Sequence, residues 1–353
     1  MESEKGMKDM KKRSFKAVLL LFVLTTLTIA LGGCSGDKKG DISSQITIGI
    51  PQDLEDSLDP HKMVTAGTRE VLFNIFEGLV KVTSDGDFVP AVASSYEETE
   101  GGKVYTFTLR DNVKFHDGST VTAEDVKFSL DKCADTSAGE PLVAAFSNID
   151  SVNILDDKTV QVVLKEADTE FLAYMTTAII PASNADPDTN PIGTGPYKFV
   201  SRSPQENFVM ERFDDYWGEP AYIKDVTFKI CANADTIVMD LEGGSIDMFA
   251  RVTSTQAAEL SDNFNVLEGT MNLVQALYLN NAEAPFDNEK VRQALCYAID
   301  PQEIMMMVSD GKGTEVGSSM FPSFGKYFMP ELNDTYNTDI EKARELLKEA
   351  GFE

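Results

Sequence analysis

Apolar and polar positions recur along this chain with two different periods, which separate expected strands from expected helices. Residues 104–110 (VYTFTLR) alternate with a period of two, as a half-buried strand does. Residues 152–164 contain two such runs joined at Asp156 and Asp157, which predicts a β-hairpin. The apolar stretch at 46–50 predicts a buried strand. Further strands are expected at 197–200, 207–213, 225–230, 246–250, 264–269 and 273–280.

Other segments carry apolar residues at the helical spacing of three and four. Residues 65–80 predict a helix whose inward side chains are Val71, Leu72, Ile75, Phe76 and Leu79. Residues 122–133 predict a second helix, opened by a capping box between Thr122 and Asp125. Further helices are expected at 234–244, 253–260, 288–299, 301–310 and 338–351. Helices and strands do not alternate strictly, so the class is α/β or α+β with a mixed sheet.

The ends of two late helices carry capping signals. Asp287 can cap the helix at 288–299, and Thr338 or Asp339 can cap the last helix. Gly351 follows that last helix and can adopt the left-handed conformation. The final helix is therefore well specified, although little sequence follows it that could cover its apolar residues Ile340, Ala343, Leu346, Leu347 and Ala350.

Residues 1–33 have the order of a secretory signal peptide, and residues 34–45 have that of a polar tether. Basic residues precede an apolar run that is too short and too rich in threonine for a comfortable membrane span. The run ends in Leu-Gly-Gly before Cys34, which matches the lipobox of bacterial lipoproteins. Cys34 is therefore the expected lipid attachment site, and two acyl chains would anchor it stably. The alternative is an ordinary signal peptide or anchor with a chance cysteine; Met7 is an alternative start.

Composition excludes several functions. The formal net charge of −27 argues against nucleic acid or anionic lipid as a partner. Cys133, Cys231 and Cys296 lie far apart, which favours buried free thiols over disulfides. With His61 and His116 as the only histidines, the chain offers neither a histidine-rich metal site nor an evident Ser-His-Asp set. His116 is expected to pack in a turn, and Tyr216 and Trp217 to plug the edge of a core. No metal or cofactor is expected.

Several stretches together resemble one protein family. They are SLDPHKMVT, FEGLV, VYTFTLRDNVKFHDGSTVTAEDVKFSL, GTGPYKF, FDDYWG, LEGGSIDM, NAEAPFDNEKVRQALCYAIDPQEI and KARELLKEAG. In this order they are similar to the bacterial extracellular solute-binding proteins of family 5, the oligopeptide- and dipeptide-binding components of ABC transporters. The resemblance runs from about residue 46 to the last residue, and its two longest motifs are the most specific.

The resemblance implies an α/β fold, a two-lobed clamshell of the type II periplasmic-binding-protein kind with an inserted domain. It places lobe one at 46–76 and 185–271, the inserted domain at 77–184, and part of lobe two at 272–353, with the crossing near Met271 to Gln275. In the family, the Leu-Leu-x-Glu-Ala-Gly helix lies inside the second lobe. The chain is therefore expected to be truncated by roughly a third, to bind peptide weakly, and to be cut by proteases first beyond about residue 272.

The resemblance also nominates ligand-binding residues. Main-chain groups of Thr65, Ala66 and Gly67 would pair with a peptide as an added strand does. Ala250 and Arg251 would end at the cleft, where Arg251 could pair with a carboxylate. Leu142 would wall the cleft, and Gln275 would lie near the hinge. Each could equally be a scaffold residue.

The implied function is capture of short peptides outside the cytoplasmic membrane and delivery to an ABC permease, by a lipid-anchored monomer without enzymatic activity. The same fold could instead bind an oligosaccharide or a nickel complex, or act as a peptide-sensing receptor. A surface hydrolase with paired carboxylates is the distant alternative.

Overall fold

The computed structural model of the chain describes residues 44–137, 139–231, 233–260, 262–269, 274–318, 320 and 328–352. All of them except Ser44 belong to one compact unit that begins at Gln45. Within these ranges, no helix has both the length and the apolar character needed to cross a membrane.

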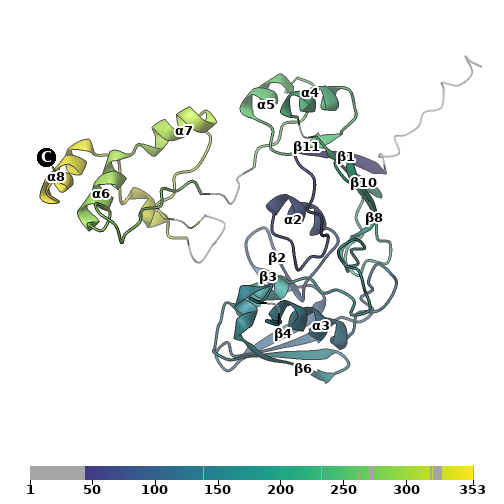
Figure 1. The fold of residues 1–353 in the computed structure, drawn as a ribbon. Helices are drawn as coiled ribbons and strands as arrows, with labels where there is room; N and C mark the ends of the chain where they lie inside the picture. Colours follow the sequence, from purple (N-terminus) through teal and green to yellow (C-terminus); the bar gives the residue numbers. More distant parts are fainter. Residues whose placement is uncertain are drawn as a thin grey trace, which may run out of the picture. The chain divides into compact units, whose positions relative to one another are not determined.

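A five-stranded mixed sheet has the strand order β11-β1-β10-β9-β8 (Figure 1). Its strands are β1 (Gln45–Ile50), β8 (Tyr197–Ser203), β9 (Asn207–Arg212), β10 (Asp225–Ile230) and β11 (Met248–Phe249). β1 runs parallel to both β10 and β11, with Ile48 opposite Phe228 and Met248. β9 is antiparallel to β10 and β8. One face of the sheet packs on helix α2 (Ala66–Leu72), which inserts Val71 and Leu72 into the core.

A four-stranded antiparallel sheet has the order β4-β5-β7-β6. Its strands are β4 (Ala93–Thr99), β5 (Val104–Leu109), β6 (Ile149–Asp156) and β7 (Thr159–Leu164). Helix α3 (Ala123–Ala134) packs on this sheet, and Val126 and Leu130 enter the core beside Tyr105 and Phe107. The hairpin β2 (Val80–Val82) and β3 (Phe88–Pro90) and the 3-10 helices η1 (Ala144–Asn148) and η2 (Phe171–Thr176) complete this part. The predicted hairpin at 152–164 and the Thr122–Asp125 capping box are confirmed.

The remaining helices form two smaller clusters. Helices α4 (Ala234–Glu242) and α5 (Ser254–Leu260) share a core that contains Cys231 and Ile246. Helices α6 (Glu289–Ala298) and α8 (Ile340–Glu349) lie side by side (Figure 1), with Ala294, Ala343 and Leu346 buried between them. α7 (Pro301–Ser309) buries none of its residues, and η4 (Pro330–Asp334) is a short 3-10 turn. α6 therefore covers part of the apolar face of α8 that the sequence left without a partner, while Ile340 stays exposed.

The helix predicted at 65–80 is much shorter, because tertiary hydrogen bonds take over the carbonyl groups that would continue it. α2 ends at Leu72. The Asn74 and Ile75 carbonyls accept hydrogen bonds from the Tyr197 and Gly195 amides at 3.1 and 2.9 Å. A Cβ at Gly195 would overlap these carbonyls, so the glycine permits the close approach. The predicted burial of Val71, Leu72, Ile75, Phe76 and Leu79 is nevertheless confirmed.

Four predictions are wrong: two strands, the cap of α6 and the burial of Cys296. Residues 264–269 and 274–280 form no strand, since no described strand supplies the pairing that a ladder needs; Leu277 and Tyr278 stay exposed. Asn288, not Asp287, caps α6, because its side chain accepts from the Lys290 amide. Cys296 is exposed, whereas Cys133 and Cys231 are the buried free thiols that were expected. Asp339 caps α8, as one of the two predicted choices.

Candidate functional site

The carboxyl ends of the parallel strands β1 and β11 lie at the same edge of the five-stranded sheet. Gly49 pairs with Phe249, so both strands end within a residue of this level. Gln52 follows β1, and its Nε2 lies 3.4 Å from where a Cβ of Gly67 would be. In open α/β sheets, ligands bind outside the carboxyl ends of the strands. This edge is therefore the candidate site, and the start of α2 forms one side of it.

Arg251, two residues past β11, forms an ion pair with Glu70 of α2. The contact joins residues 181 apart in the sequence, and the two side chains are 53% and 54% exposed. The structure thus brings Ala250 and Arg251 next to the helix that carries Ala66 and Gly67. An ion pair this exposed contributes about 0–1 kcal/mol, so another carboxylate can displace Glu70 at little cost.

The backbone of Arg251 is in the left-handed region, with φ of 66°. A residue with a Cβ occupies this region at a cost of roughly 1–3 kcal/mol, and such residues gather at ligand clamps and switch regions. Sequence reasoning found Arg251 but missed Glu70 and Gln52, since neither stands in a motif and both act through contacts distant in sequence.

The start of α2 is helical, as the apolar spacing of residues 65–80 predicts, and this restricts the added-strand pairing that the resemblance implies. Thr65 is the N-cap: its φ and ψ are −77° and 143°, and its side chain accepts from the Thr68 amide. Ala66 and Gly67 are already helical. Because helical residues cannot pair as a strand, added-strand hydrogen bonding cannot extend beyond Thr65. The Glu55 carboxylate already accepts from the Val64 amide at 3.1 Å.

The other nominated residues, Leu142 and Gln275, make no described hydrogen bond or ion pair with this group. Leu142 is exposed on the turn between α3 and η1. Gln275 is exposed and is the last residue of the crossing predicted at 271–275. Residues 271–273 of that crossing lie outside the described residues, as does Cys34. Among the described hydrogen bonds and ion pairs, those of Arg251 and Thr65 involve neither Leu142 nor Gln275.

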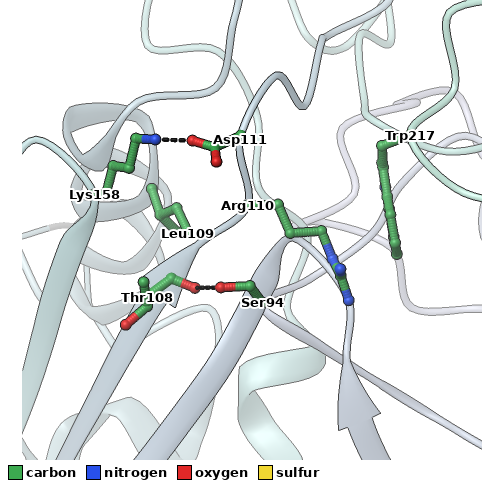
Figure 2. Close-up of a pocket in the computed structure, with 7 residues that line it drawn as sticks. All are labelled: Ser94, Thr108, Leu109, Arg110, Asp111, Lys158 and Trp217. Carbon is green, nitrogen blue, oxygen red and sulfur yellow. Dashed lines mark hydrogen bonds and ion pairs between the residues drawn. The ribbon is translucent and has the colours of Figure 1, made fainter.

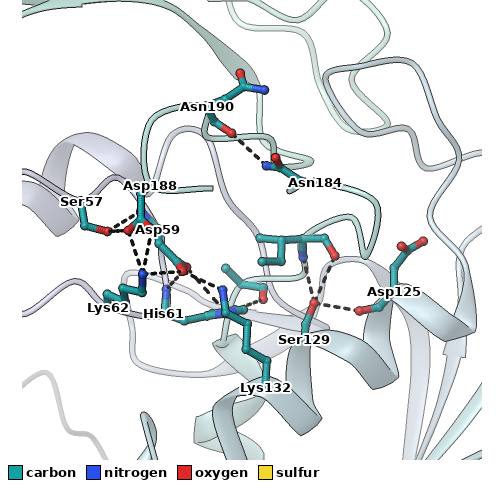
Figure 3. A network of polar contacts seen from close by, with 12 residues as sticks. Ser57, Asp59, His61, Lys62, Asp125, Ser129, Lys132, Asn184, Asp188 and Asn190 are labelled. Atoms are coloured by element: carbon teal, nitrogen blue, oxygen red, sulfur yellow. Dashed lines mark hydrogen bonds and ion pairs between the residues drawn. The ribbon is translucent and has the colours of Figure 1, made fainter. Parts of the chain in front are cut away.

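A buried polar network fixes the segment that leads into α2 (Figure 3). The Asp59 carboxylate is fully buried and accepts from Lys132 Nζ of α3 at 2.7 Å and from the His61 amide at 3.1 Å. Lys62 donates to both carboxylate oxygens of Asp188, at 2.9 and 2.8 Å. The SLDPHK motif is thus tied to α3 and to the loop at 188 before the chain reaches Thr65.

His61 completes this network as a neutral ring. Its Nε2 donates to the Ala178 carbonyl at 2.8 Å, while the buried Nδ1 makes no hydrogen bond among the described residues and lies 3.9 Å from Asp59 Oδ1. Burial is the main cause that lowers the pKa of His61, and the nearby Lys132 ammonium lowers it further. The contacts that hold the segment before α2 therefore do not depend on a change of charge of His61 near neutral pH.

A second carboxylate, which is half-buried, joins two of the family-like motifs. Glu77, of FEGLV, accepts hydrogen bonds from Tyr216 Oη at 2.7 Å and Trp217 Nε1 at 2.6 Å, both of FDDYWG. Burial raises the pKa of Glu77, although these hydrogen bonds oppose the shift. Trp217 packs on the core of the four-stranded sheet, which confirms its predicted place at a core edge. Within the described residues, no three His, Cys, Asp or Glu side chains are grouped to hold a metal ion.

Comparison with known proteins supports the motif-based resemblance. A family model described as bacterial extracellular solute-binding proteins, family 5 middle, matches residues 87–353. The glutathione-binding protein GsiB of Pectobacterium atrosepticum is 30% identical over 311 residues, covering 84% of this chain. The chain spans 59% of the length of that relative.

Solved structures show the same fold. The binding protein DppA from Helicobacter pylori, in complex with the peptide STSA, superposes with a TM-score of 0.69 at 26% identity. That match covers 87% of this chain and 66% of DppA. AgaA of A. tumefaciens R10, in complex with agropinic acid, gives a TM-score of 0.68 at 28% identity and covers 87% of this chain and 64% of AgaA. These likenesses confirm the predicted α/β fold class of type II periplasmic binding proteins. The chain belongs to the bacterial extracellular solute-binding proteins of family 5.

Proposed function

We propose that this chain is the solute-binding component of an ABC import system and captures short peptides outside the cytoplasmic membrane for delivery to permease subunits. The observation that carries the proposal is the family match over residues 87–353, together with a solved relative that shares the fold and holds a peptide. The protein binds its solute without chemical change and acts as a monomer.

The solute lies at the carboxyl edge of β1 and β11. Arg251 pairs with a carboxylate of the peptide and releases Glu70, which is its partner in the structure. Thr65, which has an extended backbone, offers its amide to the peptide in place of the Glu55 carboxylate that accepts from it in the structure, and Ala66, Gly67 and Ala250 line the site. Leu142 and Gln275 contact the solute from other segments of the chain.

The domain organisation follows the resemblance. Lobe one is built from residues 46–76 and 185–271, which include the five-stranded sheet except Gln45, the first residue of β1. Residues 77–184, which include the four-stranded sheet, form the inserted domain. Residues 272–353 belong to the second lobe.

The chain is anchored to the outer face of the cytoplasmic membrane through lipid on Cys34, after removal of residues 1–33. The test is labelling of the expressed protein with a radioactive fatty acid. Wild type should incorporate label and partition into detergent, and Cys34→Ala should do neither. Equal labelling of the variant would reject the lipoprotein assignment.

A non-peptide solute is the second candidate, favoured by AgaA, whose structure holds agropinic acid. Calorimetry with di- to octapeptides, opines, oligosaccharides and nickel–histidine complexes distinguishes the two. Binding of peptides, without cleavage products and with a higher melting temperature, supports the peptide proposal. Binding of only another solute class rejects it. A peptide-sensing receptor would bind peptide equally, and is separated from an importer by peptide uptake in cells that carry the permease.

The contribution of Arg251 is tested by Arg251→Gln, which should weaken peptide binding about tenfold or more through loss of a charge-assisted contact. Arg344→Gln is the matched control, because Arg344 is an exposed arginine of α8 that pairs only with Glu341 among the described residues. Equal affinities of the two variants would remove Arg251 from the site.

A further inference from the structure

A pocket of about 380 Å³ opens at one end of the four-stranded sheet, where the start of β4, the end of β5 and the β6–β7 turn meet (Figure 2). Its lining includes two cationic side chains, Arg110 and Lys158, together with Asp111, Ser94 and Trp217. None of these residues belongs to the candidate solute site at the β1–β11 edge.

Arg110 is held rigidly at one wall of this pocket. Its Nε donates to the Ala91 carbonyl at 2.6 Å, and its Nη2 lies 3.4 Å from the Pro90 carbonyl. The guanidinium lies over the Trp217 ring, 4.4 Å from the ring centroid. Nη1 has no hydrogen-bond partner among the described residues. Because the guanidinium plane is fixed, that donor is offered without the usual loss of side-chain freedom.

The Trp217 ring is fixed from its other end. Its Nε1 donates to the half-buried Glu77 carboxylate at 2.6 Å, so the indole cannot turn without leaving that group without a donor. Lys81 adds a second cation, 5.4 Å from the ring centroid. Trp217 therefore packs against the core with one part of its surface and forms a rigid wall of the pocket with another.

The charged side chains of the lining, rather than its hydroxyl, favour an anion over a cation. Ser94 Oγ already donates its proton to the Thr108 carbonyl at 3.0 Å and has no second proton to offer a ligand. Asp111 is paired with Lys158, and these two side chains are 71% and 55% exposed. Such an exposed pair is weak, so Lys158 can turn to a ligand at small cost. Counting this pair as neutral leaves the charge of Arg110 in excess within the pocket.

We infer that this pocket binds a small oxyanion, either a carboxylate or a phosphate, with Arg110 as the donor and Trp217 as the wall against which the bound group rests. Lys158 adds attraction from the opposite side. The observation is independent of the proposed transport function, because the pocket is built from the four-stranded sheet and the turn at Trp217 alone.

The test uses the indole N–H resonance of Trp217 in a ¹H–¹⁵N spectrum of the chain, which contains a single tryptophan. Benzoate and inorganic phosphate are titrated separately at constant ionic strength. Saturable movement of this resonance is expected with at least one of them, and the two titrations show whether a carboxylate or a phosphate is preferred. No movement with either anion overturns the inference.

Variants test the donors. Arg110→Lys keeps the charge but loses the planar fork, and should weaken binding about tenfold. Lys158→Gln should weaken it about threefold, and Asp111→Asn, which frees Lys158, should strengthen it by a similar factor. Lys224→Gln is the control for lost charge, since Lys224 is exposed and does not line the pocket. If the Arg110→Lys variant does not fold, the anion affinities of Lys158→Gln and Asp111→Asn still test the inference. If Lys158→Gln and Asp111→Asn both bind the anion with the same affinity as Lys224→Gln, the inference is overturned.

Discussion

Single ionisable side chains that are buried or half-buried join segments of this protein that are far apart in sequence. Asp59 reaches Lys132, Glu77 reaches Tyr216 and Trp217, and His116 reaches the turn at Gly193 to Gly195. Each buried polar group must keep its partner, because loss of the partner leaves its desolvation uncompensated. The stability of the fold should therefore respond strongly to a few polar substitutions.

Lys132→Met should destabilise the protein by about 3 kcal/mol, because it leaves the buried carboxylate of Asp59 without its close cation. The Asp59 side chain is 1% exposed and lies 2.7 Å from Lys132 Nζ. The control is Lys127→Met on the same helix, whose exposed pair with Asp131 should be worth less than about 1 kcal/mol. Urea unfolding measures both, and equal losses would contradict the role of Lys132.

His116 should stay neutral far below neutral pH. Burial chiefly lowers the pKa of His116 to about 4, and Lys198 lowers it further. Its Nε2 donates to the Gly195 carbonyl at 3.0 Å, and its Nδ1 accepts from the Gly193 amide at 3.3 Å. The prediction that His116 packs in a turn is therefore confirmed.

The lowered pKa of His116 determines how the free energy of unfolding changes with pH. The unfolded chain binds a proton at His116 below pH about 6.5, whereas the folded chain resists it until about pH 4. The stability that the neutral His116 contributes is thus fully present above pH 6.5. It is lost as the pH falls toward 4, and the free energy of unfolding decreases by roughly 3 kcal/mol at most. His116→Gln should flatten this part of the stability curve. NMR titration of the two histidines checks the pKa directly, and a midpoint near 6.5 for His116 would contradict it.

At the level of elements, caps define where helices begin, and α3 shows how one cap also serves the tertiary structure. The Thr122 side chain accepts from the Asp125 amide, and Asp125 Oδ2 accepts from the Thr122 amide at 2.9 Å. The other carboxylate oxygen, Oδ1, accepts from the Ala182 amide at 2.9 Å. Asp125 therefore fixes the loop after Pro181 as well as the start of α3.

Thr122→Ala should cost about 1 kcal/mol, the usual loss for an N-cap side chain. Asp125→Ala should cost more, because it removes acceptors from two backbone amides in different segments. Glu124→Ala changes a neighbouring exposed acidic residue and should stay within about 0.5 kcal/mol of wild type. Thermal unfolding ranks the three variants; a loss for Asp125→Ala no greater than that for Thr122→Ala would show that the contact to Ala182 adds nothing.

At the level of the whole molecule, burial is distributed unevenly along the chain. The large core of the four-stranded sheet contains fully buried Tyr105, Phe107 and Phe171, whereas the α6–α8 cluster is built around Ala294, Ala343 and Leu346. α7 buries no residue, and Met306, Met307 and Val308 are exposed. Regions with few buried apolar contacts open at low free-energy cost.

Limited proteolysis should therefore cut first between residues 274 and 352 and leave a resistant fragment that ends before residue 272. Mass spectrometry of the fragments locates the cuts, and hydrogen exchange should show faster exchange in α7 than in α3. Equal resistance of α7 and α3 would contradict this reading of the burial.

The resemblance of the motifs and their order identified the family, and periodicity and caps located most elements. Strands β1, β5 to β10, the α3 capping box and the Asp339 cap were predicted from neighbouring residues alone, because these signals act over two to four positions. The same local information placed α2 but not its end, since the hydrogen bonds that stop it at Leu72 come from residues 195 and 197.

The residues of the candidate site were likewise predicted only in part from the sequence. Sequence reasoning nominated Arg251 and Thr65, but nothing near them in the sequence indicates Glu70 or Gln52 as neighbours. It also could not place Lys132 beside Asp59 or Arg110 over Trp217. What the sequence determined by itself is the family, through the resemblance of motifs along the chain, and the periodic elements and most of their caps, which depend on residues a few positions apart. Only the tertiary structure decided which charges and carbonyls meet, because those contacts depend on the strand order β11-β1-β10 and on the loops that bring distant segments together.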